Sequence, residues 1–60
     1  MRIKSLIKLL GEFERVIIKD MDDVILFEDS NYKLEDSVLK ELKVSKFYGI
    51  ESGIEIYVTL

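Results

Sequence analysis

The sequence predicts a small α+β domain: a four-stranded antiparallel sheet with two short helices on one face, in the order helix, hairpin, helix, hairpin. Three observations lead to this fold. The chain has 60 residues, enough for one domain with one core. Two segments carry apolar residues at helical spacing, and four others are short and rich in β-branched or aromatic residues. Residues 1–60 are therefore interpreted as a single domain.

Residues 3–10 are predicted to form the first helix. Their apolar side chains recur at the i, i+3, i+4, i+7 spacing of one helical face: Ile3, Leu6, Ile7 and Leu10. Gly11 follows at the position where a helix commonly ends in a left-handed cap. So short a helix is not stable alone, and its apolar face must pack against the sheet.

The second helix is predicted over about 34–42. Its apolar residues again share one face: Leu34, Val38, Leu39 and Leu42. Acidic residues stand in its first turn and lysines in its last, which is the polarity that the helix dipole favours. We expect Val38 and Leu42 to join the core beneath the sheet.

Four strands are predicted at 14–19, 24–28, 44–50 and 54–60. The four-residue segment Asp20–Asp23 joins the first two, because aspartates bond their own backbone in tight loops. Glu51–Gly53 joins the last two. The final strand alternates most clearly, so Ile54, Ile56 and Val58 are expected on the face beneath the helices.

The opposite face of the sheet is expected to be unusually apolar. The first two strands carry large apolar residues at successive positions, and Ile17, Phe27 and Tyr57 are assigned to this outer face, with either Phe47 or Tyr48. Exposed apolar patches commonly mark an interface. A core of this size also offsets the entropy of folding only narrowly, which favours association.

The main hypothesis is therefore a small, non-enzymatic protein-interaction module. We expect a homodimer with Ile17, Phe27 and Tyr57 in the interface. The alternatives are a different partner protein on the same face, ordinary surface apolarity, or a different strand register.

No catalytic, cofactor-binding or metal-binding residues are predicted. Histidine and cysteine are absent, which removes the usual nucleophile–base pairs and zinc ligands. The Asp20–Asp23 segment lacks the central glycine of a calcium loop, and Asn31 stands where that loop needs glutamate. Its aspartates are interpreted as solvated turn residues.

The charge pattern leaves two further alternatives open. The net charge is −3, yet residues 1–19 are basic and residues 20–36 acidic. A nucleic-acid-binding surface would use the basic residues of the first part of the chain: Arg2, Lys4, Lys8, Arg15 and Lys19. An acidic mimic of nucleic acid would instead use residues 20–36. The acidic balance of the whole chain argues against direct nucleic-acid binding.

Apolar runs are far shorter than the roughly 20 residues that cross a bilayer, so we expect no membrane span. The N-terminal segment lacks the features of a signal peptide, and the absence of cysteine fits a reducing compartment. These observations predict a cytoplasmic location.

Three segments, Arg15–Glu28, Leu34–Val44 and Ile54–Val58, resemble small uncharacterised proteins encoded by phages and prophages of Gram-positive bacteria. The resemblance covers most of the chain and rests on its pattern of strands and turns. It implies a host-cell cytoplasmic setting and an accessory role, such as binding a host or viral protein. It supplies no site residues.

Overall fold

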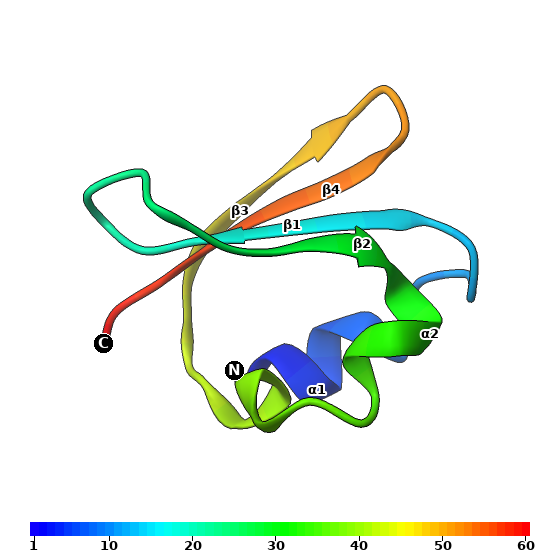
Figure 1. Ribbon diagram of the computed structural model, residues 1–60, viewed down its shortest axis with the longest axis horizontal. Coiled ribbons are helices and arrows are strands. Elements are labelled where there is room, and N and C mark those ends of the chain that lie inside the picture. The colour runs from blue at the N-terminus through cyan, green and yellow to red at the C-terminus, as the bar shows by residue number, and fades with distance from the viewer.

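The computed structural model describes all residues from Met1 to Leu60 and has two layers (Figure 1). One layer is a four-stranded sheet, and the other holds three short helical elements on one side of it. The elements are α1 (Ile3–Ile7), β1 (Arg15–Lys19), β2 (Ile25–Ser30), α2 (Asn31–Leu34), the 3₁₀ helix η1 (Val38–Glu41), β3 (Val44–Ile50) and β4 (Gly53–Val58). The predicted α+β class is confirmed. No helix has the length and apolarity that a membrane crossing requires.

The sheet is mixed, so the prediction of a fully antiparallel sheet is wrong. The strand order is β2-β1-β4-β3, with two antiparallel hairpins joined through a parallel pair, β1 and β4. The segment between β2 and β3 carries the chain from one edge of the sheet to the other. The fully buried residues of the sheet all lie on the two central strands: Val16, Ile18, Ile56 and Val58. Their burial favours the central position of β1 and β4 in the sheet.

The predicted second helix is two separate short elements, α2 and η1. Ser37 lies between them and has an extended backbone (φ −93°, ψ 143°). Its hydroxyl accepts a hydrogen bond from Leu39 N at 3.1 Å. Serine side chains compete with helical hydrogen bonds in this way. The break turns Val38 into solvent, where it is 84% exposed, so its predicted place in the core is wrong.

The first helix ends differently from the expectation. The α-helix covers Ile3–Ile7, and single turns continue the chain to Leu10. No glycine has a positive φ angle, so Gly11 is not a left-handed cap. The Asn31 side-chain amide instead donates to the carbonyls of Ile7 at 3.1 Å, Leu10 at 3.5 Å and Gly11 at 3.2 Å. A residue of α2 therefore supplies the hydrogen-bond donor for the backbone carbonyls at the end of this segment.

The core lies between the helical layer and the inner face of the sheet. Nine apolar residues are buried there: Ile3, Leu6, Ile7, Val16, Ile18, Leu34, Ile54, Ile56 and Val58. Leu10, Leu39 and Leu42 are partly buried against them. The predicted inner position of Ile54, Ile56 and Val58 is confirmed, because β4 alternates between buried and half-buried residues along its length.

The loop between β1 and β2 is held by hydrogen bonds between its backbone and an aspartate side chain, as the sequence predicted. Asp20 Oδ1 accepts hydrogen bonds from Asp22 N at 2.8 Å and Val24 N at 3.0 Å. Asp23 takes a left-handed φ of 65°, a conformation that aspartate tolerates better than most residues. The carboxylate of Asp20 therefore has a structural role in this loop.

Candidate functional site

The outer face of the sheet has no layer over it, because every helical element lies on the opposite side (Figure 1). Parallel strands are commonly covered on both faces, so an open face over the β1–β4 pair is unusual. The strand register assigns twelve residues to this outer face: Arg15, Ile17, Lys19, Ile25, Glu28, Ser30, Lys46, Tyr48, Ile50, Gly53, Glu55 and Tyr57. The name outer face is used below for this set.

A hydrogen-bonded cluster occupies the middle of the outer face. The Tyr57 hydroxyl donates to Glu55 Oε1 at 2.8 Å, and Lys19 Nζ lies 3.4 Å from Glu55 Oε2. Register places Lys19 beside Tyr57 and Ile17 beside Glu55 on the paired strand. The side chains of Lys19 and Glu55 are only 21% and 22% exposed, so this ion pair is better shielded than the others in the molecule.

The cluster shifts the pKa values of two of its members in opposite directions. Hydrogen bonding to Glu55 raises the pKa of Tyr57 to about 12 from 10.0, helped by desolvation and by the negative charge of Glu55. The hydrogen bond from Tyr57 lowers the pKa of Glu55, and Lys19 lowers it further. At neutral pH the phenol is therefore a proton donor to a carboxylate, and the arrangement is stable over a wide pH range.

The cluster extends onto β3 through Tyr48 and Lys46, which both contact the ring of Tyr57. Tyr48 meets Tyr57 edge to face, with ring centroids 6.0 Å apart. Lys46 Nζ lies 4.8 Å from the centroid of the Tyr57 ring and 5.8 Å from that of Tyr48. Edge-to-face rings and a cation above their faces attract each other. These contacts hold the two rings in fixed positions at an open surface.

The structure brings together two of the three residues predicted for the interface. Ile17 and Tyr57 share the outer face. Phe27 does not, because it pairs with the buried Ile18 and packs against the core, so its assignment to the outer face is wrong. A bulge is the cause: Ile18 pairs with Phe27 but Lys19 pairs with Ile25, which leaves Leu26 as an extra residue and reverses the alternation.

The aromatic residue of β3 that faces outward is Tyr48. It pairs with Glu55, whereas Phe47 pairs with the buried Ile56 on the inner face. Sequence reasoning missed Lys19, Lys46 and Glu55 as partners of Tyr57. The alternation of the last strand did indicate that Glu55 and Tyr57 share a face, but no local signal connects them with residues from other strands.

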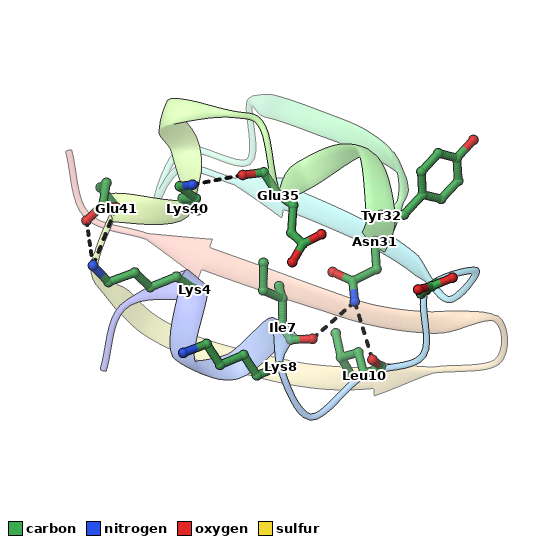
Figure 2. Close-up of a pocket in the computed structure, with 10 residues that line it drawn as sticks. Lys4, Ile7, Lys8, Leu10, Asn31, Tyr32, Glu35, Lys40 and Glu41 are labelled. Carbon is green, nitrogen blue, oxygen red and sulfur yellow. Dashed lines mark hydrogen bonds and ion pairs between the residues drawn. The ribbon is translucent and has the colours of Figure 1, made fainter.

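A pocket of about 500 Å³ opens in the helical layer, on the other side of the sheet from the outer face. Figure 2 shows its lining, which includes Lys4 and Lys8 from the first helical segment and Tyr32 and Glu35 from the second. Asn31, the residue that caps the first segment, forms part of its wall. No local pattern predicted this pocket, because its lining residues come from three separate segments.

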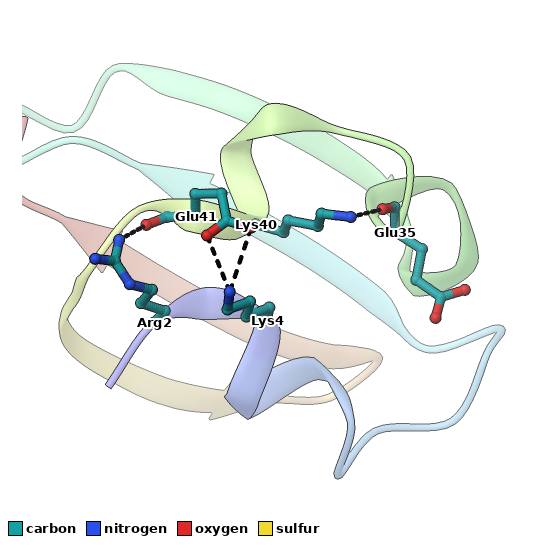
Figure 3. A network of polar contacts seen from close by, with 5 residues as sticks. All are labelled: Arg2, Lys4, Glu35, Lys40 and Glu41. Carbon is teal, nitrogen blue, oxygen red and sulfur yellow. Dashed lines mark hydrogen bonds and ion pairs between the residues drawn. The ribbon is translucent and has the colours of Figure 1, made fainter.

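The basic residues proposed for nucleic-acid binding do not converge on one surface. Lys4 Nζ lies 3.1 Å from Glu41 Oε1, and Arg2 donates to the carbonyl of Glu41 (Figure 3). Arg15 lies on the outer face, where it is paired with Glu28. Contacts to acidic partners within the chain therefore offset much of the positive charge that phosphates would need.

The acidic residues of the segment 20–36 are also dispersed. The Asp20–Asp23 loop and α2 lie at opposite ends of the molecule (Figure 1). Lys33 lies 3.3 Å from Asp29, and Arg15 pairs with Glu28. No group of three or more carboxylates comes close enough to hold a metal ion. The segment does not present a continuous acidic surface.

Comparisons with protein-family models, with curated proteins and with solved structures give no match for this chain.

Proposed function

We propose that this protein is a non-enzymatic protein-interaction module that pairs with a second copy of itself through the outer face. The observation that carries the proposal is the open face over the β1–β4 pair, where Tyr57 of β4 meets Tyr48 of the neighbouring β3 edge to face. Tyrosine is enriched among the residues that dominate binding energy at interfaces. Rings already held in place lose little conformational freedom on binding, which favours association.

The charges of the outer face suit a symmetric contact. It carries three basic residues and two acidic ones, and four of these five lie in ion pairs: Arg15–Glu28 and Lys19–Glu55. Lys46 is the remaining cation and lies against the tyrosine rings. A two-fold axis brings a surface against its own copy, so a face with mixed charges avoids the repulsion that a single sign would cause.

The size of the molecule sets an expectation for affinity. Its total accessible surface is 4007 Å², and a standard interface takes about 800 Å² from each partner, or roughly a fifth of that surface. We therefore expect weak association, with a dissociation constant between about 10 μM and 1 mM.

The resemblance to phage and prophage proteins extends this proposal. It would place the module in the cytoplasm of a bacterial host, as an accessory protein. In that setting the dimer would be the form that meets a host or viral protein.

Molar mass from light scattering over a concentration series tests the proposal. Tyr48→Asp is the informative variant, because Tyr48 is 52% exposed and its substitution leaves the core intact. Val38→Asp is the matched control, since it adds the same charge at an exposed apolar residue outside the outer face. We expect a mass that rises toward the dimer value for the parent and the control, and a monomer for Tyr48→Asp.

A parent protein that stays monomeric at all concentrations up to about 1 mM would contradict self-association. Equal loss of the dimer in Tyr48→Asp and Val38→Asp would place the contact elsewhere. Circular dichroism spectra that match the parent would show that each variant is folded.

A further inference from the structure

The pocket in the helical layer holds a buried hydrogen-bond acceptor without a partner. Asn31 is 6% exposed, and its Oδ1 atom accepts no hydrogen bond within the protein. The amide orientation is fixed, because rotating it by half a turn would put this oxygen against three carbonyl oxygens that now accept from Nδ2. Figure 2 shows the oxygen turned toward the pocket, away from those hydrogen bonds. A ligand group that meets it must be a donor.

Charged groups of both signs line the same pocket. Lys4 is neutralised by Glu41, and Lys40 Nζ donates to the backbone carbonyl of Glu35 at 2.9 Å. Lys8 and the carboxylate of Glu35 enter no ion pair or hydrogen bond in the structure. Figure 2 shows the Glu35 carboxylate on the side of Asn31 and the ammonium groups of Lys4, Lys8 and Lys40 on the other side. The pocket therefore has an acceptor end and a cationic end.

Glu12 is a further acidic residue of the pocket lining. Its backbone carbonyl accepts from Tyr32 N at 2.9 Å, which places it next to Asn31 in the fold. A primary ammonium group has three N–H donors. The amide oxygen of Asn31 and the carboxylate of Glu35 offer acceptors of the kind such a group needs.

We propose that this pocket binds a small zwitterion of the amino-acid class. The ammonium group meets Asn31 Oδ1 and the carboxylate of Glu35, and the acid group meets Lys8. The volume of about 500 Å³ lies within the range of small-molecule sites. A simple cation would be repelled by the lysine end and a simple anion by the carboxylates, so the lining favours a ligand with both charges.

Titration of the isotope-labelled protein, followed by amide chemical shifts, tests the proposal. The probes are three ω-amino acids of increasing length: glycine, 4-aminobutyrate and 6-aminohexanoate. Butylamine and butyrate, each with one of the two charges, are the ligand controls. For a ligand of about seven non-hydrogen atoms, we expect a dissociation constant of about 1 mM, with shifts at Lys8, Asn31 and Glu35.

Variants with matched charge changes identify the contacts. Glu35→Gln and Lys8→Gln should each weaken binding about two- to fivefold, the range expected for one contact of an exposed charge. Glu51→Gln and Lys43→Gln make the same charge changes at exposed residues that do not line the pocket, and should leave binding unchanged.

Two outcomes would overturn the proposal. The first is an absence of shifts at these residues with all three amino acids up to about 10 mM, ten times the expected constant. The second is equal binding of butylamine or butyrate, or equal weakening by the control variants, which would indicate general electrostatic attraction. Neither outcome affects the outer face, because the residues that line the pocket belong to the helical layer, on the other side of the sheet.

Discussion

Gly53→Ala tests the parallel contact between β1 and β4 that defines this sheet. Gly53 pairs with Arg15 at the start of that contact. A Cβ atom added at Gly53 would lie 1.9 Å from the carbonyl oxygen of Arg15 and 2.8 Å from its carbonyl carbon and its nitrogen. Real Cβ atoms essentially never approach another heavy atom closer than 3.0 Å. The obstacle is backbone, so the two strands would have to separate.

The expected cost follows from this overlap. Overpacking that flexible side chains can absorb costs about 1–3 kcal/mol, and a clash with backbone belongs at or above the upper limit. We therefore expect Gly53→Ala to lower the free energy of unfolding by about 3 kcal/mol or more. A domain of this length has a total stability of about 3–9 kcal/mol. The corresponding fall in melting temperature is about 12–24 °C.

Thermal unfolding followed by circular dichroism measures this effect. Gly49→Ala is the matched control, because an added Cβ at Gly49 meets no atom within 4 Å. Its melting temperature should stay within about 8 °C of the parent value, since alanine and glycine differ by less than about 1 kcal/mol at such positions. A Gly53→Ala protein that melts as close to the parent as Gly49→Ala does would refute the parallel register.

Three further predictions concern the caps, the split helix and the tyrosine cluster. Asn31→Leu should lower stability by about 2 kcal/mol in urea unfolding, because the carbonyls of Ile7, Leu10 and Gly11 lose their donor, and an unchanged midpoint would contradict the capping role. Leu34→Ala should cost about 2–5 kcal/mol and Val38→Ala less than about 0.5 kcal/mol, whereas similar costs would indicate one continuous amphipathic helix. In an ultraviolet pH titration, Tyr57 should ionise near pH 12 because Glu55 raises its pKa, and Glu55→Gln should bring that pKa down. The raised pKa of Tyr57 contributes stability that is present below pH 10.0 and is lost as the pH rises toward about 12. The lowered pKa of Glu55 contributes stability that is present above pH 4.5 and is lost on further acidification. A free energy of unfolding that stays constant across both limits would contradict this linkage.

Local patterns in the sequence predicted most of the elements. β3 has the predicted bounds, and the alternation in β4 identified its buried residues. The order of the strands had no such signal, because pairing β1 with β4 depends on the path of the chain between the hairpins. The prediction of a fully antiparallel sheet assumed that the two hairpins meet through an antiparallel pair of strands. The burial of Val16 and Ile18 against Ile54 and Ile56 instead favours a parallel central pair.

The errors at the candidate site have equally specific causes. Tyr57 and Ile17 were assigned to the correct face because their strands alternate without interruption. Phe27 was not, because one extra residue at Leu26 reverses the phase of β2, and a bulge leaves no clear mark in a run of apolar residues. The cap by Asn31 joins residues about twenty positions apart, which is beyond the reach of local spacing rules.

The central claim is that a second copy binds to the outer face. Amide chemical shifts of the isotope-labelled protein, recorded from about 10 μM to 1 mM, test it most directly because they report both association and its location. We predict concentration-dependent shifts at Ile17, Lys19, Tyr48 and Tyr57, with α1 and η1 unaffected. Shifts confined to the helical layer, or no change over the whole range, would contradict the account.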